Sequence, residues 1–530
     1  MSSNSVTKFT PVQSSVVHYK GKALVVKSRA GTGKTTMLRG YAEANPTIPM
    51  LYICYNASIR EEAQKKFPSN VTCRTMHAIA YARKGVLYKH KLTGNLRLTD
   101  IKNFLNLPSW DTTKYVLDTL NSYLNSASTD IEVGHAPSNS PKHMRPALCE
   151  LANKLWKACI DPAHEMQITH DMYLKLYCLE PADLHRWFAV ILFDEAQDSN
   201  PVVSDYLYRQ QCSHIVVGDE HQQLYRWRGA NNSMADFIKT KNADVIVVNT
   251  SFRFGATIAK VASTLLAYKS SITKGELADV FGNESINDQV SDLMPRPLQR
   301  ERYTRLHRTV AGTIKTALDN IDRRLYWVGG IGAYNLQEVL DVYYFSTNQT
   351  TKIKRTKLKS DYKNYAEYKV AAKSTEDLEM SRIIRMIDEH GSSLERKIKL
   401  LQANAVNSED RAELVISTAH RSKGLEWPVV ELADDFPDLL DTKKNRFDKE
   451  GLADELNLLY VACTRAIKHL VLNTLVMSLD KLVHGKQSPY ITRSQFKPED
   501  KAASTRTGRD VTRFDVSPNG PRHSVPLNKD

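Results

Sequence analysis

Short runs of apolar, β-branched residues recur along the first half of the chain, and each is followed by polar or glycine-rich residues. Runs of this kind are typical of parallel strands that are buried on both faces of an α/β sheet. Functional residues are then expected at the edge of the sheet where the strands end. The six runs are Ala23 to Lys27, Met50 to Tyr55, Asn70 to Cys73, Phe188 to Asp194, His214 to Gly218 and Asp244 to Asn249.

Between the third and the fourth run, the apolar residues follow a helical period instead. We expect residues 83–184 to form a helical insertion, interrupted by a loop at Ser126 to Pro141, where serine, proline and glycine gather. Strand-like runs return late in the chain and predict a second α/β domain on the same plan. These later runs are Glu413 to Ser417, Pro428 to Leu432 and His469 to Asn473.

The predicted fold class is therefore α/β, with two parallel sheets that each carry a mainly helical insertion. The charged segment at residues 290–405 is expected to be the insertion of the second domain. Its lysine- and tyrosine-rich stretch, Thr351 to Lys369, fits a solvated helix face as well as a duplex-contacting patch. We expect residues 487–530, which are poor in large aliphatic side chains, to be a disordered tail. The remaining predicted boundaries are 1–82 and 185–250 for the first domain, and 251–289 and 406–486 for the second.

The net charge of the chain indicates which class of partner it is expected to bind. Among 530 residues, lysine and arginine exceed aspartate and glutamate by 14, and the isoelectric point is about 9.2. A polyanion such as nucleic acid is the expected partner, although a basic surface without a specific ligand would have the same composition.

The spacing of the cysteines and the absence of long apolar stretches indicate the cellular compartment that we expect for the chain. The seven cysteines are scattered and include no CxxC pair, which disfavours a disulfide framework and a zinc ribbon and favours a reducing compartment. No stretch approaches the roughly 18 apolar residues of a membrane span, and Met1 to Lys20 lacks a signal-peptide core. We expect no membrane partner, and a location in the cytoplasm or at the nucleoid of a bacterium or virus-infected cell, or in the nucleus of a eukaryote.

The first predicted strand runs into SRAGTGKTT, which fits the phosphate-binding P-loop pattern. Gly31 and Gly33 let backbone N–H groups turn toward phosphates, Lys34 reaches the β- and γ-phosphate oxygens, and the Thr35 hydroxyl completes a magnesium shell. Ser28 stands where the stricter pattern has glycine. The expected ATP-binding residues of this loop are Ser28, Arg29, Ala30, Gly31, Thr32, Gly33, Lys34, Thr35 and Thr36.

A second motif follows the fourth predicted strand, in FAVILFDEAQD. Asp194 is predicted to be a magnesium ligand beside Thr35, and Glu195 is predicted to polarise the water that attacks ATP. An acidic pair at an ordinary strand end is the alternative, which the upstream P-loop disfavours. The two motifs predict an NTPase that uses ATP and Mg²⁺, and they do not specify its task.

Further motifs give the chain a resemblance to a known family. VGDEHQQLYRWRGA, SFR, STAHRSKGLEW and LLYVACTRA follow the two NTPase motifs in order. Together they resemble the motifs of superfamily 1 helicases of the UvrD/Rep type, and the matches extend from Gln13 to about Leu470. The resemblance implies two RecA-like P-loop domains. It also implies an ATP-driven DNA translocase and helicase of 3′ to 5′ polarity, active in DNA replication, recombination or repair.

The resemblance implies roles around the nucleotide. Gln13 would read the adenine, Phe252 would stack on it and Glu426 would contact the sugar. A motor also needs cations from a second domain that neutralise the γ-phosphate when the cleft closes, and Arg253 and Arg465 are the candidates. A surface salt bridge is the alternative for either arginine. With Gln222 as a γ-phosphate contact, the expected catalytic set is Lys34, Asp194, Glu195, Gln222, Arg253 and Arg465.

The resemblance also implies a binding track for single-stranded DNA. Three aromatic residues, Tyr55, Tyr225 and Trp227, could stack on bases without sequence preference, and core packing is the alternative for each. Histidine and threonine side chains would hold the backbone. The expected DNA-binding set is Tyr55, Asn56, Thr75, His77, Tyr225, Trp227, Arg228, Thr418 and His420.

Within this family, the likeness is greatest to the helicase portion of the F-box DNA helicases, on stretches such as VGGIGAYNLQEVLDVYYF. Only a short segment precedes Gln13, so no F-box is expected, and no acidic cluster of a nuclease module follows Asn473. The expected partners are single-stranded DNA and single/double-strand junctions, with a recombinase or a single-strand binding protein as further candidates, and a monomer is favoured.

Three rival functions stay open at this point. The first is a motor that strips proteins such as recombinase filaments from single strands with little unwinding, and the second is an RNA helicase. The third is a nucleotide-binding scaffold without catalysis, which the intact catalytic set disfavours.

Overall fold

The structure is a computed structural model. It describes residues 8–54, 57–224, 226, 233–355, 357–375, 377–440 and 447–493, with the backbone alone for residues 57, 58 and 378. Across these residues, no helix has the length and apolar character that a membrane span requires.

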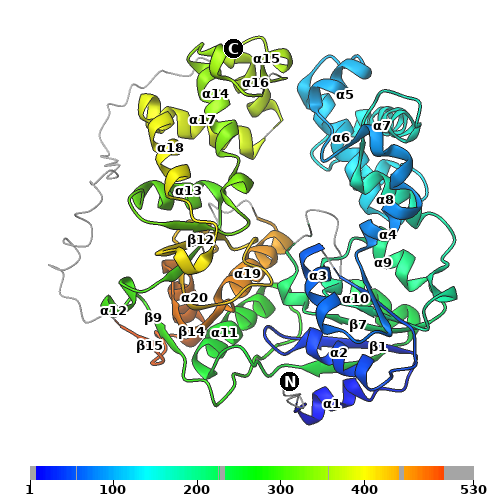
Figure 1. The fold of residues 1–530 in the computed structure, drawn as a ribbon, viewed down its shortest axis with the longest axis vertical. Coiled ribbons are helices and arrows are strands. Elements are labelled where there is room, and N and C mark those ends of the chain that lie inside the picture. Colours follow the sequence, from blue (N-terminus) through cyan, green and yellow to red (C-terminus); the bar gives the residue numbers. More distant parts are fainter. Residues whose placement is uncertain are drawn as a thin grey trace, which may run out of the picture. The chain divides into compact units, whose positions relative to one another are not determined.

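Within the described residues, the first sheet contains six parallel strands in the order β3-β2-β6-β7-β1-β8. Figure 1 labels β1 and β7 of this sheet. β1 pairs with β7 on one side and β8 on the other, and Leu24, Val25 and Val26 in it are fully buried. Burial on both faces explains why β1, β2, β6 and β7 are continuous apolar runs in the sequence, whereas the edge strand β8 is mostly exposed. All six strands predicted in the first half are confirmed. They are β1 (Ala23–Ser28), β2 (Met50–Ile53), β3 (Val71–Arg74), β6 (Val190–Phe193), β7 (Ser213–Gly218) and β8 (Asp244–Val248).

Helices pack on this sheet, and a mainly helical segment separates β3 from β6. The loop that was predicted at Ser126 to Pro141 joins two of its long helices, α6 and α7. The helices beside the sheet are α1 (Pro11–Val17), α2 (Lys34–Glu43), α3 (Ala57–Lys66), α9 (Pro201–Tyr208) and α10 (Ser233–Lys241). The inserted elements are α4 (Met76–Arg83), β4 (Leu92–Thr93), α5 (Leu98–Phe104), α6 (Trp110–Asn125), α7 (Arg145–Ile160), β5 (Ile168–Thr169) and α8 (His170–Cys178).

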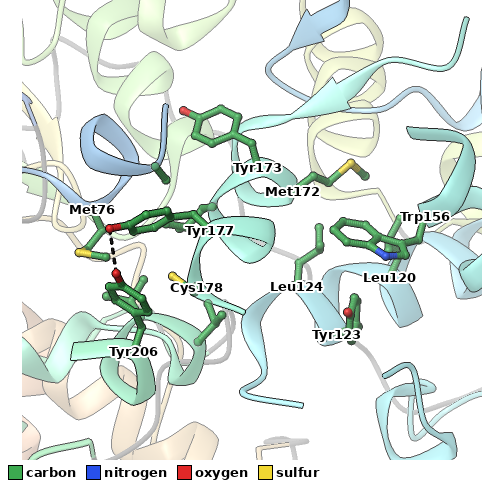
Figure 2. Close-up of a cluster of buried hydrophobic side chains, with 14 of the residues drawn as sticks. Met76, Leu120, Tyr123, Leu124, Trp156, Met172, Tyr173, Tyr177, Cys178 and Tyr206 are labelled. Atoms are coloured by element: carbon green, nitrogen blue, oxygen red, sulfur yellow. Dashed lines mark hydrogen bonds between the residues drawn. The ribbon is translucent and has the colours of Figure 1, made fainter. Parts of the chain in front are cut away.

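A continuous hydrophobic core joins the inserted helices to the first sheet (Figure 2). Tyr177 of α8 and Tyr206 of α9 are both buried in it, with ring centroids 5.0 Å apart. The Tyr206 hydroxyl lies 2.8 Å from the Tyr177 hydroxyl and 3.0 Å from Asp183 Oδ1. The insertion is therefore packed directly on the helices of the first sheet.

The second sheet has seven parallel strands among the described residues, in the order β11-β12-β10-β13-β14-β9-β15. The three late strands of the sequence prediction are confirmed as β12, β13 and β14. The predicted insertion at residues 290–405 starts too early, because β10 and β11 pair with β12 in this sheet. The strands are β9 (Gln289–Ser291), β10 (Tyr303–His307), β11 (Leu325–Trp327), β12 (Leu414–Thr418), β13 (Trp427–Leu432), β14 (Ala466–Val471) and β15 (Ile491–Thr492).

Helices cover both faces of the second sheet and form separate cores on them. α11, α19 and α20 contribute to one core, and α13 shares the other with the helical segment between β11 and β12. The first group is α11 (Ala256–Thr273), α19 (Lys449–Cys463) and α20 (Thr474–His484). The second group is α13 (Val310–Asp319), α14 (Leu336–Ser346), α15 (Lys357–Asp361), α16 (Tyr365–Ser374), α17 (Leu378–His390) and α18 (Leu394–Asn404), and α12 (Arg296–Gln299) is a single turn before β10.

The start of the predicted tail belongs to the second sheet. Buried Asp480 accepts hydrogen bonds from the Ser488 backbone N–H at 2.8 Å and from the Tyr490 hydroxyl at 2.9 Å. These bonds bring β15 alongside β9. The prediction of a disordered tail from residue 487 is therefore wrong for residues 487–493, and residues 494–530 lie outside the described part of the chain.

Candidate active site and strand interface

The loop between β1 and α2 has the geometry of an anion cradle. Gly31 has φ +73° and Gly33 has φ +79°, in the left-handed region that favours glycine. A Cβ on Gly31 would also lie 2.4 Å from Ser251 Oγ, so a side chain cannot be placed there without movement. α2 begins at Lys34 without a side-chain cap, and its first N–H groups are therefore available to an anion.

Ser28, which departs from the strict P-loop pattern, is part of a hydroxyl network inside the loop. Its Oγ lies 2.9 Å from Thr32 Oγ1, and Thr32 Oγ1 lies 2.9 Å from the Arg29 carbonyl oxygen. Ser28 and Thr32 are both buried. The hydroxyl of Ser28 therefore stabilises the loop through an internal hydrogen bond to Thr32. The two glycines of the P-loop keep their left-handed conformations.

Two carboxylates at the end of β6 face the loop. Glu195 Oε1 lies 2.8 Å from Lys34 Nζ, and Asp194 Oδ2 accepts hydrogen bonds from Thr35 Oγ1 at 3.0 Å and from the Tyr52 hydroxyl at 2.7 Å. The structure therefore brings Lys34, Thr35, Asp194 and Glu195 together, as the sequence predicted. Oxygen ligands suit Mg²⁺, and the Thr35 hydroxyl and the Asp194 carboxylate are close enough to share one ion.

The two carboxylates have opposite pKa shifts. Burial and the neighbouring Glu195 charge raise the pKa of Asp194. Burial also acts to raise the pKa of Glu195, but Lys34 and Lys423 outweigh it and lower that pKa to about 2. Glu195 is thus held ionised, which a residue that accepts a proton from water requires.

Lys423, which follows β12 of the second sheet, reaches Glu195 and the neighbouring carboxylate of Asp198. Its Nζ contacts the Asp198 carboxylate, lies 3.9 Å from Glu195 Oε2 and donates to the Gln222 carbonyl oxygen at 2.8 Å. Lys423 is not among the site residues predicted from the sequence, although it lies within STAHRSKGLEW. Gln222 itself is buried, and its side-chain amide donates to Asp219 Oδ2 at 2.7 Å.

Two arginines from beyond the first sheet meet near the loop. Arg253 Nε donates to Glu426 Oε2 at 2.5 Å, and its Nη1 donates to the Thr464 carbonyl oxygen at 3.0 Å. A Cβ on Gly31 would lie 2.8 Å from Arg253 Cβ, so this arginine abuts the P-loop. The structure therefore places Arg253 and Glu426 together, next to residues predicted to bind ATP.

Arg465 is 2% exposed and is held by neutral acceptors. It donates to the carbonyl oxygens of Val461 at 2.9 Å and Leu425 at 3.2 Å. Burial, together with the nearby Arg253 charge, lowers the pKa of Arg465 to about 9, while the Glu195 charge acts in the opposite direction. A buried cation of this kind favours the arrival of an anion.

The remaining nucleotide-side candidates lie around the loop. Gln13 Nε2 donates to the Thr32 carbonyl oxygen at 3.0 Å, and its Oε1 accepts from the Thr10 backbone N–H. The backbone N–H of Phe252 donates to the Gly31 carbonyl oxygen at 2.7 Å, and the Phe252 side chain is 43% exposed. An exposed aromatic ring beside a phosphate loop is available to stack on a base.

A tyrosine from α19 ties the second sheet to the P-loop. The Tyr460 hydroxyl accepts a hydrogen bond from the Ala30 backbone N–H at 3.1 Å and donates to Asp219 Oδ2 at 3.2 Å. Burial raises the pKa of Tyr460 far above its usual range, so the hydroxyl keeps its proton. Tyr460 is likewise not among the site residues predicted from the sequence, although it lies within LLYVACTRA.

The strand-side candidates are described only in part. Thr75 Oγ1 caps α4 by accepting the Ala78 N–H at 3.1 Å, and His77 Nε2 lies 3.1 Å from Asp171 Oδ1 with its side chain 43% exposed. Thr418 ends β12, and burial, with the Arg308 charge, lowers the pKa of His420 to about 4, so that its ring is neutral near pH 7. The other candidates lie outside the described residues; these are Tyr55, Asn56, Tyr225, Trp227 and Arg228.

Comparison with known proteins agrees with this arrangement. Residues 65–476 match the family described as UvrD-like helicase C-terminal domain, which covers more than half of the chain. The chain belongs to the UvrD-like helicase family. Its two sheets are accordingly the two RecA-like units of a superfamily 1 helicase fold, and the α/β fold class predicted from the sequence is confirmed.

Curated relatives of this UvrD-like helicase chain include two named for an F-box. F-box DNA helicase 1 of Gallus gallus is 30% identical over 517 residues, which cover 89% of this chain and 50% of the chicken protein. F-box DNA helicase protein 1 of Schizosaccharomyces pombe is also 30% identical, over 88% of this chain and 57% of its own length. The chain therefore spans only about half the length of these relatives.

A more distant relative lacks the F-box name. A probable DNA helicase II homolog of Mycoplasma genitalium is 22% identical over 435 residues, which cover 62% of this chain and 61% of that protein. The resemblance to the UvrD/Rep type and to F-box DNA helicases that the sequence predicted is thus confirmed.

Proposed function

We propose that this chain is an ATP hydrolase that moves along single-stranded DNA and unwinds duplex DNA, in the 3′ to 5′ direction. The observation that carries the proposal is the convergence of residues from both sheets on one phosphate cradle. Lys34 and Glu195 come from the first sheet, whereas Lys423 and Arg465 come from the second. A site divided in this way is complete only when the two units are close together, which links hydrolysis to domain movement.

In the proposed mechanism, the phosphates of ATP replace Glu195 as the partner of the Lys34 ammonium. The ammonium that now pairs with Glu195 at 2.8 Å would turn to the β- and γ-phosphate oxygens. Glu195, freed from this pair and ionised, would orient the attacking water and accept its proton. Arg253 and Arg465 would neutralise charge on the γ-phosphate, and Gln222 would contact it.

The cofactor would be held by residues that already lie together. Thr35 and Asp194 would hold a magnesium ion, which when bound neutralises charge on the phosphate oxygens. Gln13 and Phe252 would bind the adenine and Glu426 the sugar. The remaining loop residues, from Ser28 to Thr36, would bind the phosphates through backbone N–H groups.

The strand would bind along both sheets. We infer that Thr75 and His77, at the start of α4, and Thr418 and His420, at and just beyond the end of β12, hold the DNA backbone. A neutral His420 would act as a hydrogen-bond donor or acceptor and not as a cation. Opening and closing of the two units would then shift these two groups of contacts relative to each other, and the strand would advance.

ATP hydrolysis by the wild type and by Glu195→Gln, with and without single-stranded DNA, tests the catalytic part of the proposal. We expect DNA to stimulate hydrolysis by the wild type, and the variant to lose roughly a hundredfold or more in kcat while it still binds ATP. Glu150→Gln is the matched control, because Glu150 lies on the exposed side of α7. Equal turnover by Glu195→Gln and the wild type would refute the assignment.

A further inference from the structure

A lysine on α11 joins two segments of the candidate site that come from different sheets. Lys269 Nζ lies 3.0 Å from His221 Nδ1 and donates to Asn457 Oδ1 at 2.7 Å. His221 lies in the turn Glu220–Gln222, which follows β7, and Asn457 lies on α19. Neither the sequence motifs nor the proposed mechanism uses Lys269.

His221, which follows β7 of the first sheet, accepts a hydrogen bond from Lys269. It is 9% exposed, and burial, followed by the Lys269 charge, keeps the pKa of its ring well below the usual value. The ring is therefore neutral, and its Nδ1 accepts the proton that Lys269 donates. His221 immediately precedes Gln222, the proposed γ-phosphate contact, and its backbone N–H donates to Asp219 Oδ1 at 3.1 Å.

On the other side, Asn457 fixes the chain that follows Gln222. Its side-chain amide donates to the Gln223 carbonyl oxygen at 3.1 Å, while its Oδ1 accepts from Lys269. The same helix carries Tyr460, whose hydroxyl meets the Ala30 backbone N–H of the P-loop. Lys269 thus orients an amide that holds the 220–223 segment against α19.

We propose that Lys269 is a positioning residue that locks the 220–223 segment onto α19 and thereby sets how strongly DNA accelerates ATP hydrolysis. This inference rests on the proposed function. In the sequence, this segment is followed closely by Tyr225 and Trp227, which are predicted from the sequence to contact DNA and lie outside the described residues. A movement that begins at the DNA would therefore reach Gln222 through backbone that Lys269 and Asn457 hold in place.

The charges around the amine explain why a lysine suits this position. Burial, with the Arg29 charge, lowers the pKa of Lys269 to about 8, whereas the carboxylates of Asp219, Glu220 and Asp454 act to raise that pKa, so that the amine is still charged near pH 7. An ammonium supplies three donors for two acceptors and offsets the three carboxylates. A methionine would leave both acceptors without their donor, whereas an arginine would keep the charge and the donors.

Titration of ATP hydrolysis with a single-stranded oligonucleotide tests the proposal, with the 530-residue wild-type chain, Lys269→Met and Lys269→Arg. We expect Lys269→Met to keep its basal rate and its KM for ATP within about twofold, and to lose roughly tenfold in the DNA-stimulated kcat. Lys269→Arg should recover most of that loss. Lys260→Met is the control, because Lys260 is exposed on the same helix, where its Nζ lies 5.6 Å from the Tyr490 ring centroid.

A double-mutant cycle separates positioning from general destabilisation. If Lys269 acts through Asn457, then Asn457→Leu alone should lower the stimulated kcat, and adding Lys269→Met should lower it little further. Additive losses, or a stimulated kcat in Lys269→Met equal to that of the wild type, would overturn the inference and leave the proposed function intact. A wild type that hydrolyses ATP at one rate with and without DNA would overturn both.

Discussion

Arg465 is a buried cation that the described residues pair with neutral oxygens alone. Such a group is costly in a folded protein unless an anion joins it. Its low exposure and the nearby Glu195 and Arg253 charges place it where the γ-phosphate is proposed to bind. A surface salt bridge, the alternative reading of the sequence, does not fit a side chain that is 2% exposed.

Replacement of Arg465 should therefore lower the kcat of ATP hydrolysis more than it lowers the affinity for ATP. We expect Arg465→Ala to lower the DNA-stimulated kcat about a thousandfold, because an arginine at the transferred phosphoryl group acts mainly in the transition state. Steady-state hydrolysis and equilibrium binding of a fluorescent ATP analogue measure the two effects. Arg396→Ala, on the exposed face of α18, is the control, and thermal unfolding of both variants excludes a folding defect. An unchanged kcat would contradict the role.

Much of the geometry of the candidate site could be predicted, because the residues that lie together there belong to short contiguous motifs. Gly31, Lys34 and Thr35 are fixed by one loop, and Asp194 and Glu195 by one strand end. Lys423, Tyr460 and Lys269 were missed because their roles depend on partners far away in sequence. The bond between the Ala30 N–H and Tyr460, for example, spans 430 positions.

Among the elements, α6 has an unusual C-terminal cap. Lys175 of α8 is fully buried and donates to the carbonyl oxygens of Ser126 and Ser128, both at 2.7 Å, just beyond the end of α6. Its Nζ also lies 4.3 Å from the Tyr123 ring centroid. A cation at the C-terminus of a helix interacts favourably with the helix dipole and with the last carbonyl groups.

The stability contributed by Lys175 should depend on pH. Burial lowers its pKa from 10.5 to about 8, so between these values the unfolded chain binds the proton and the folded chain does not. Stability therefore rises with pH between about 8 and 10.5, and only this pH-dependent gain is lost when the pH falls back to about 8, since below that pH the ammonium keeps its hydrogen bonds. We expect Lys175→Met to cost about 2 kcal/mol at pH 7, since the carbonyl oxygens of Ser126 and Ser128 lose their donor.

Denaturant unfolding at pH 7 to 10 checks this prediction. The difference in unfolding free energy between the wild type and Lys175→Met should widen above pH 8, by up to about 1.4 kcal/mol per pH unit. Lys114→Met, which removes a partly exposed pair with Asp118 on α6, should change stability by less than about 0.5 kcal/mol at every pH. A difference that stays constant or shrinks as the pH rises would contradict the assignment.

The elements themselves were predictable where burial on both faces produces an uninterrupted apolar run. β10 and β11 were assigned to the insertion because polar and charged residues interrupt or adjoin them, as in YTRLH and RRLYW. Their membership in the sheet depends on pairing with β12, which no local pattern encodes. β15 was assigned to the predicted tail for the same reason. It has only two residues, which are too few to form an apolar run, and it is a strand only because it pairs with β9.

For the whole molecule, the central feature is that each of the two sheets contributes residues to the one candidate active site. Lys423 of the second sheet reaches Glu195 and Asp198 of the first, and Tyr460 reaches the P-loop. A change in the distance between the sheets would therefore alter the charges around Glu195 directly. This arrangement suits a motor, in which binding of ATP and movement on a strand have to occur together.

Strand separation on duplexes with a 3′ or a 5′ single-stranded tail, with ATP and magnesium, is the most direct test of this account. We predict that the wild type separates the 3′-tailed duplex, that ATP is required, and that Glu195→Gln separates neither. ATP hydrolysis stimulated by DNA without strand separation would favour a motor that strips proteins from single strands. Separation of the 5′-tailed duplex alone, or equal separation by Glu195→Gln and the wild type, would contradict the account.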